Sequence, residues 1–255
     1  MGMGHSNSSF WNQIYNAGMI GERKFALCFS DTEGVDRDGT HAGAITLGGS
    51  NAALHRSPMI YAENTNSENG WFSIVVTGIY LKMEREDEEV DTVIKLDLDL
   101  DKFNERGIIL DSGTTETYLP KITQAPFEKA FEELLGEPFR EEIENLGEEN
   151  PLIDYPSVLI QIRGASNVDL DDIEQDGVRH EGLAGALDPD SPDDVILELP
   201  PTSYIDYNKR KNKFTNRLHM VESGMGILGA NAMFDYDILF DVEGGRIGFA
   251  SSDCN

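Results

Sequence analysis

The strongest constraint on this chain is a run of apolar residues that ends in an acid. Residues 107–110 read Gly-Ile-Ile-Leu, Asp111 follows, and residues 112–115 read Ser-Gly-Thr-Thr. A fully apolar run is typical of a buried strand, and a carboxylate at its end needs hydrogen-bond donors. The hydroxyl groups of 112–115 and the backbone N–H groups around Gly113 can supply them. The pattern by itself fits either a functional carboxylate or an aspartate that caps a β-turn.

Most of the remaining pattern predicts short strands. β-branched and aromatic residues alternate with Gly- and Asn-rich turns, which is typical of a β-rich fold built of hairpins. In Leu96–Asp101 leucine and aspartate alternate, so we expect a half-buried strand there. The expected strands are Phe25–Phe29, Ala44–Leu47, Trp71–Leu81, Val93–Leu100, a strand ending at Pro120, Val158–Ile162, Val195–Leu199, Tyr236–Phe240 and Arg246–Ala250.

Two short helices and two loops complete the expected elements. Ser8 and Ser9 precede apolar residues at helical spacing over Phe10–Tyr15, and a second such pattern covers Phe127–Leu135. The charge run Glu84–Glu89 is expected to be a solvated loop. Residues from about 166 to 194 are rich in Asp, Gly and Pro, which predicts an acidic insertion.

Composition excludes several classes of function. The 255 residues are 39% hydrophobic, which is enough for a substantial core, and no apolar run is long enough to span a bilayer. The formal net charge of −27 would repel phosphate backbones, so we expect no nucleic-acid partner. Two cysteines without Cys-x-x-Cys spacing, and aspartates spread along a strand, predict no metal site. We expect no cofactor.

Several motifs in order carry a family resemblance. The segment 107–115, then Ile227–Ala230, then residues 237–250 resemble the carboxy-terminal lobe of pepsin-like aspartic proteases. Further landmarks are Phe25–Phe29, His41–Gly49, Tyr155-Pro156, Leu199-Pro200 and Tyr204. The resemblance implies a mostly β fold with short helices, the second lobe of a bilobal enzyme that hydrolyses peptide bonds.

The same resemblance implies roles for the residues that match the family's motif. Asp111 would be one catalytic acid, Thr114 would orient its carboxylate, and Ser112 would bond across to the partner loop. The remaining matches would be Gly113, which lets backbone approach the substrate, Thr115, next in the cleft, and Leu228 and Gly229, which pack behind the loop.

The family pattern also implies a missing part. Pepsin-like enzymes have two lobes that each supply an Asp-Thr/Ser-Gly loop, and this sequence contains one such loop. Residues 1–4 resemble the tail of the first lobe. We therefore expect a fragment or truncated gene product, with 1–24 as a first-lobe remnant and interlobe connection and 25–255 as the carboxy-terminal lobe.

The chemistry explains why a partner would be needed. Two carboxylates about 3 Å apart, the known arrangement in aspartic proteases, share one proton and divide the roles of base and acid. Asp111 alone has no such partner, so the chain would need the missing lobe or, in a homodimeric protease, a second copy. A non-catalytic peptide-binding module is the third hypothesis.

This reasoning also gives expectations for the chain by itself. An apolar strip at Ile108–Leu110 and Ile227–Leu228 is expected to be exposed where the first lobe would lie. We expect a monomeric, inactive chain near neutral pH, and aggregation or dimerisation in acid as the repulsion between carboxylates fades.

The two cysteines, Cys28 and Cys254, could be separate buried thiols. In the beta-secretase branch of the family, cysteines at matching positions are bridged, so the resemblance, nearest to that branch and to protist relatives, implies a disulfide. On the chain-entropy account it would stabilise the fold by roughly 4 to 5 kcal/mol. A disulfide implies the secretory pathway, in a vacuolar, lysosomal or extracellular location with a membrane anchor left open. The sequon Asn7-Ser8-Ser9 agrees with that location.

Overall fold

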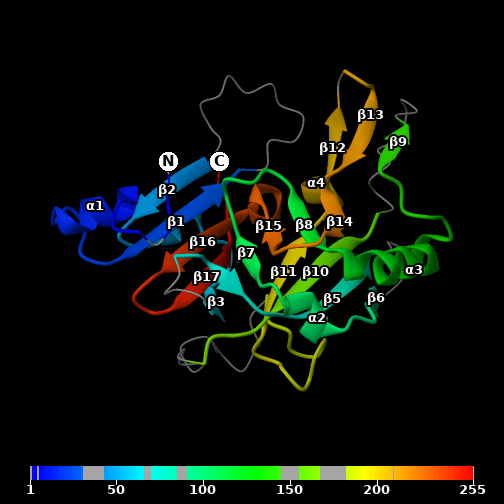
Figure 1. Ribbon diagram of the computed structural model, residues 1–255, viewed down its shortest axis with the longest axis horizontal. Coiled ribbons are helices and arrows are strands. Elements are labelled where there is room, and N and C mark those ends of the chain that lie inside the picture. Colours follow the sequence, from blue (N-terminus) through cyan, green and yellow to red (C-terminus); the bar gives the residue numbers. More distant parts are fainter. Residues whose placement is uncertain are drawn as a thin grey trace. The chain divides into compact units, whose positions relative to one another are not determined.

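The computed structural model describes residues 2–4, 6–30, 43–65, 70–84, 91–144, 155–166, 182–208 and 210–254. The chain forms two compact units. The first comprises Met1–Val75, Ile162–Ile196 and Met233–Asn255, and the second comprises Val76–Gln161 and Leu197–Ala232. Both are mostly β with short helices (Figure 1), which confirms the predicted fold class.

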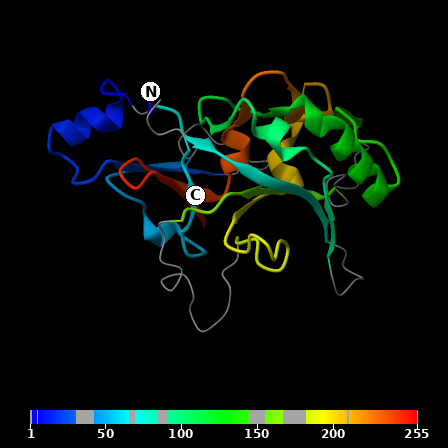
Figure 2. The same ribbon diagram turned by 60° about the horizontal axis from the view of Figure 1, so that its bottom comes forward.

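A five-stranded antiparallel sheet organises the first unit. Its strand order is β2-β1-β16-β17-β3, and Figures 1 and 2 both show the hairpin β16–β17 beside β1. The strands are β1 (Lys24–Phe29), β2 (Gly43–Leu47), β3 (Ile60–Glu63), β16 (Tyr236–Asp241) and β17 (Arg246–Ser251). The unit also contains α1 (Phe10–Asn16), the 3₁₀ turn η1 (Ala52–Leu54) and β4 (Ser73–Ile74).

Aromatic rings and a disulfide hold this sheet together. The fully buried Trp11 of α1 stacks on Phe25 at 5.8 Å between ring centroids, and Phe25 stacks on Phe240 at 4.8 Å. Cys28 of β1 is bridged to Cys254 just after β17, with 5.3 Å between their Cα atoms. The disulfide implied by the family resemblance is therefore present.

In the second unit, one sheet has the order β11-β10-β5-β6. Its strands are β5 (Val76–Met83), β6 (Thr92–Lys95), β10 (Ser157–Ile162) and β11 (Val195–Leu199), and the chain passes between the two units within β10 and β11. The helix α3 (Gln124–Leu135) packs against β5 and β6 through the side of the helix that carries the buried Phe127 and Phe131. Gly136 ends the helix in a left-handed conformation at φ 72°.

The same unit carries the strands around the acid-bearing loop. β14 (Leu218–Glu222), β8 (Thr117–Pro120), β15 (Gly226–Leu228) and β7 (Ile108–Leu110) lie side by side in that order. β15 runs parallel to β7, with Ile227 opposite Ile109. A small sheet combines β12 (Ile205–Asn208), β13 (Lys213–Asn216) and β9 (Glu142–Glu144). The remaining elements are α2 (Leu100–Asn104), α4 (Pro201–Tyr204), η3 (Lys121–Thr123) and η5 (Ala230–Met233).

Two strand predictions are wrong at their ends. The expected strand Val93–Leu100 stops at Lys95, and Asp99 instead caps α2, where its carboxylate accepts a hydrogen bond from the backbone N–H of Lys102 at 3.2 Å. A helix cap thus overrides the leucine–aspartate alternation. The expected strand Trp71–Leu81 is divided into β4 and β5, and Trp71 itself is half exposed.

Some predictions concern residues that the structure describes only in part. Residues 85–90 of the charge run, residues 167–181 of the insertion and His41-Ala42 lie outside the described residues. Asn7 of the sequon is exposed. Among the helices that the described ranges contain, none has the length and apolar content to cross a bilayer.

Candidate active site

The Asp111 loop begins where β7 ends. All three residues of β7 are buried, as the apolar run predicts, and the backbone N–H of Asp111 donates to the carbonyl of Leu228 at 3.0 Å. Both oxygens of the Asp111 carboxylate are fixed: Oδ1 accepts from the backbone N–H of Gly113 at 2.9 Å, and Oδ2 accepts from the hydroxyl of Thr114 at 2.7 Å. The acid is partly exposed to solvent. Within the described part of the chain, both groups that donate to this carboxylate are uncharged.

The backbone of the loop makes a close contact with Gly229. A Cβ atom at Gly229 would lie 2.2 Å from the carbonyl oxygen of Glu116 and 2.8 Å from that of Thr114, so only glycine permits this approach. The next two backbone N–H groups bind the loop directly: Ala230 donates to the Thr114 carbonyl at 2.7 Å, and Asn231 donates to that of Thr115 at 3.2 Å. Residues 228–231 therefore support the loop from behind.

Two supporting residues were missed by the sequence analysis. The hydroxyl of the fully buried Thr117 donates to Oδ1 of Asn231 at 2.7 Å, and it accepts from the backbone N–H of Gly229 at 3.2 Å. The Asn231 side chain donates to the carbonyls of Ser203 at 3.1 Å and Arg217 at 3.2 Å. Thr117 is the first residue of β8, a strand whose residues are mostly buried.

The expectation of an exposed apolar strip is wrong for four of its five residues. Ile108, Ile109, Leu110 and Leu228 are at most 5% exposed, and Ile227 is partly exposed. These residues lie on adjacent strands, and the side chain of Ile108 occupies the space that a Cβ at Gly226 would fill, 2.5 Å away. A fully apolar strand is characteristic of burial on both faces, so this segment is core.

The loop ends in a charged cluster. The Glu116 carboxylate accepts hydrogen bonds from Arg217 at 2.9 Å, His219 at 2.7 Å and the Tyr118 hydroxyl at 3.2 Å, and the rings of Tyr118 and His219 stack at 4.9 Å. Burial would raise the pKa of Glu116, but the hydrogen bond from His219 and the positive charge of Arg217 outweigh it and lower the pKa. Burial, together with the Glu116 charge, raises the pKa of Tyr118.

Of the other predicted residues, Ser112 is partly exposed and Thr115 is exposed. Asp111, Gly113 and Thr114 are brought together by hydrogen bonds, with Leu228 and Gly229 behind them. No three His, Cys, Asp or Glu side chains in the described ranges are grouped so that they could hold a metal ion. The arrangement can therefore present one oriented carboxylate for proton transfer.

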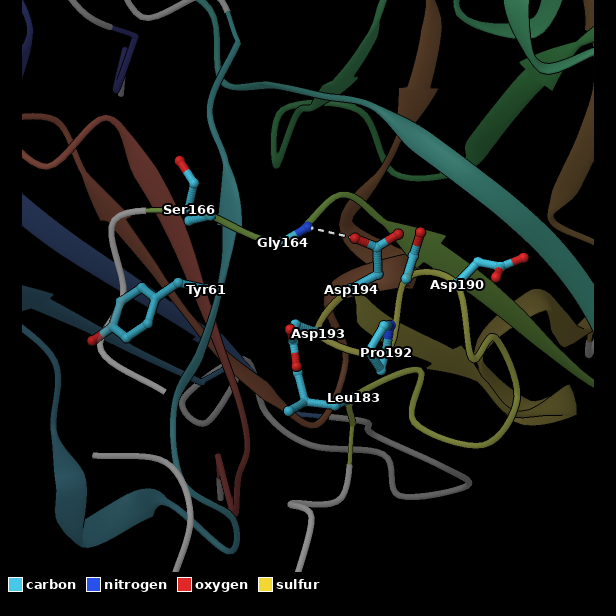
Figure 3. A pocket seen from close by; sticks show the side chains of 10 residues that line it. Tyr61, Gly164, Ser166, Leu183, Asp190, Pro192, Asp193 and Asp194 are labelled. Carbon is cyan, nitrogen blue, oxygen red and sulfur yellow. Dashed lines mark hydrogen bonds between the residues drawn. The ribbon is translucent and has the colours of Figure 1, made fainter. Parts of the chain in front are cut away.

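The first unit contains a separate pocket of about 310 Å³ (Figure 3). Its lining includes Tyr61, Gly164 and three aspartates, Asp190, Asp193 and Asp194. The Asp194 carboxylate accepts from the backbone N–H of Gly164 at 2.9 Å, the dashed line in Figure 3, so this acid fastens Gly164 to the segment that precedes β11. Asp111 is not part of this pocket.

Comparison with known families identifies the family of the chain. The sequence model described as "Eukaryotic aspartyl protease" matches residues 1–252. The chain belongs to the eukaryotic aspartyl protease family. None of the curated protein sequences matches it significantly. Family membership implies peptidase chemistry on peptide substrates, and a disulfide in a eukaryotic aspartyl protease indicates the secretory pathway.

Proposed function

We propose that this chain supplies one half of an aspartic endopeptidase active site, with Asp111 as one of the two catalytic acids. The observation that carries the proposal is the fixing of both Asp111 carboxylate oxygens by uncharged donors at the end of a buried strand. A carboxylate held in this way keeps a defined orientation. The second acid would come from a first lobe or from a second copy of the chain.

The reaction needs both acids. The ionised carboxylate takes a proton from water, whose oxygen attacks the peptide carbonyl carbon, while the protonated partner gives its proton to the carbonyl oxygen. The tetrahedral intermediate then loses the amine, which leaves with a proton returned from the dyad. In this scheme Thr114 orients Asp111, Ser112 bonds across to the partner loop, Gly113 admits the substrate backbone, and Thr115 lies next in the cleft.

We assign the chain to the carboxy-terminal lobe of a bilobal enzyme, nearest to the beta-secretase and protist branch. The order of the motifs and the Cys28–Cys254 bridge support this assignment. Residues 1–24 would then be the first-lobe remnant and connection, and 25–255 the lobe with its insertion at about 166–194. The proposed location is vacuolar, lysosomal or extracellular.

A homodimeric protease is the second candidate. It is favoured by one observation, the single Asp-Ser/Thr-Gly sequence in the chain. The molecular mass of the 255-residue chain at neutral and acid pH, measured alongside peptide cleavage, separates the candidates. Cleavage that appears only with the dimer supports the second, and cleavage only after addition of a first lobe supports the first.

The role of Asp111 is tested by Asp111→Asn in whichever assembly cleaves peptides. We expect a loss of activity of about a thousandfold or more, because the amide cannot exchange the proton. Asp190→Asn, an exposed aspartate, is the matched control and should leave activity unchanged. Activity of Asp111→Asn within tenfold of the parent would remove Asp111 from the mechanism. An inactive assembly that still binds peptides would favour a non-catalytic binding module.

A further inference from the structure

Glu116 links the end of the Asp111 loop to the neighbouring strand β14. The backbone bonds of Ala230 and Asn231 hold the loop at the carbonyls of Thr114 and Thr115, and the next N–H along, that of Thr117, donates to the Arg217 carbonyl at 3.1 Å. Between Thr115 and Thr117, the carbonyl oxygen of Glu116 lies close against Gly229, where a Cβ atom would clash with it. Its side chain supplies the lateral link, through Arg217 and His219 on the side of β14.

The side chains that face Glu116 come from two neighbouring segments. Arg217 and His219 lie on the side of β14, Tyr118 belongs to β8, and Arg217 also pairs with Asp206 of β12. The guanidinium of Arg217 is charged throughout the ordinary pH range. Burial would raise the pKa of Glu116, but the hydrogen bond from His219 and the charge of Arg217 outweigh burial and lower it.

The cluster is only partly exposed, which limits screening by water. The side chains of Glu116, Arg217 and His219 are 27%, 30% and 23% exposed. The stacking of Tyr118 on His219 restricts the imidazole ring on one side. The Glu116 carboxylate, 2.7 Å from the His219 imidazole, belongs to the loop itself.

We infer that Glu116 is a positioning residue for the Asp111 loop, which it clamps to β14 through Arg217 and His219. This inference rests on the proposed function of Asp111. Glu116 acts through the backbone of residues 114–116 and does not touch the reacting atoms.

The activity test uses Glu116→Gln in the assembly that cleaves peptides. The amide keeps the size of the side chain but loses the charge, so we expect kcat at acid pH to fall about fivefold with KM within twofold. Glu142→Gln is the matched control, because Glu142 pairs with Lys211 and Lys213 and its pKa is also lowered, first by the hydrogen bond from Lys211. The control should leave both constants unchanged.

A second measurement does not depend on activity. In the full chain, the amides of Ala230 and Asn231 report on the loop because they donate to its carbonyls. Their hydrogen-exchange protection, compared at one pH, should be several-fold lower in Glu116→Gln than in the parent. Glu142→Gln should leave this protection unchanged.

The outcomes separate the inference from the proposed function. Equal protection of these two amides in the parent and in Glu116→Gln would overturn the clamp. So would an unchanged kcat in Glu116→Gln. If Asp111→Asn retains activity while the protection pattern is as expected, the loop clamp stands as a structural device and its catalytic purpose is refuted.

Discussion

Three aspartates, Asp237 and Asp241 in the first unit and Asp111 in the second, differ in what holds them. In the first unit, Asp237 is 1% exposed and contacts His55 at 2.9 Å, and Asp241 is 2% exposed and pairs with Arg246 at 2.9 Å and Lys24 at 3.6 Å. In the second unit, Asp111 is partly exposed and accepts from a backbone N–H and a hydroxyl. Asp237 and Asp241 are therefore enclosed beside basic side chains, whereas Asp111 is oriented by uncharged donors.

This difference separates two uses of a carboxylate. When one partner of a buried ion pair is removed, the other is left as an uncompensated charge. An acid held by a backbone N–H and a hydroxyl keeps its orientation without such a pair. Substitution of an acid of the first kind should therefore cost stability, and substitution of Asp111 should cost activity.

The largest loss of stability is expected when the disulfide beside Asp237 is removed. Cys28 lies opposite Asp237 across β1 and β16, and its bridge to Cys254 spans 226 residues of sequence. Cys28→Ala combined with Cys254→Ala should lower the free energy of unfolding by about 5 kcal/mol on the chain-entropy account. Denaturant unfolding measures it, with the reduced parent as the control. A loss below about 1 kcal/mol would mean that other contacts secure this sheet.

The next largest loss of stability is expected when Asp241, which pairs with Arg246, is substituted. Asp241→Asn leaves Arg246, which also stacks on Tyr61 at 4.1 Å, without its buried counter-charge. Because the Arg246 side chain is 23% exposed, we expect a loss of about 2 to 3 kcal/mol, less than for a fully buried pair. Unfolding of Asp190→Asn, in which an exposed aspartate is changed, gives the baseline. Equal unfolding curves for the two variants would contradict the assignment of Asp241 to the fold.

A smaller loss of stability is expected for an ion-paired group of the second unit, Lys82. Burial lowers the pKa of Lys82, but hydrogen bonds and charge interactions with Glu198 and Glu84 outweigh burial and raise the pKa to about 12. The pair then stabilises the fold fully below the ordinary lysine pKa of about 10.4, and the contribution is lost as pH rises through about 12.

Lys82→Met measures this contribution, which we expect to be below about 1 kcal/mol because Glu198 and Glu84 are substantially exposed. The difference in unfolding free energy between Lys82→Met and the parent should be constant up to about pH 10 and shrink above it. A difference that grows above pH 10 would show that the sign of the lysine shift is wrong.

Local patterns made part of the site predictable from sequence. The apolar run before Asp111 indicated a buried strand, and the hydroxyl and glycine residues after it indicated donors; both are found in the structure. The contact of Thr117 with Asn231 joins residues 114 positions apart, so no local pattern indicates it. The Glu116 cluster likewise depends on β14 lying beside β8, a pairing set by the sheet order.

The errors had physical causes that are visible in the residues. The alternation at Leu96–Asp101 predicted a strand, yet Asp99 is also a strong helix cap, and the cap determined the structure. The run Ile108–Leu110 was expected at a lobe surface, although its lack of polar residues indicates burial on both faces. In both segments the sequence carried two conflicting patterns, and the prediction followed the one that does not determine the structure.

The central claim is that Asp237 serves the fold whereas Asp111 serves catalysis. The most direct test compares the unfolding free energies of Asp111→Asn and Asp237→Asn. We predict that Asp111→Asn lies within about 1 kcal/mol of the parent, because the amide oxygen still accepts one of the two uncharged donors. Asp237→Asn, 1% exposed and in contact with His55, should lose at least about 2 kcal/mol. A loss for Asp111→Asn as large as that for Asp237→Asn would show that Asp111 serves the fold, and would contradict its assignment to catalysis.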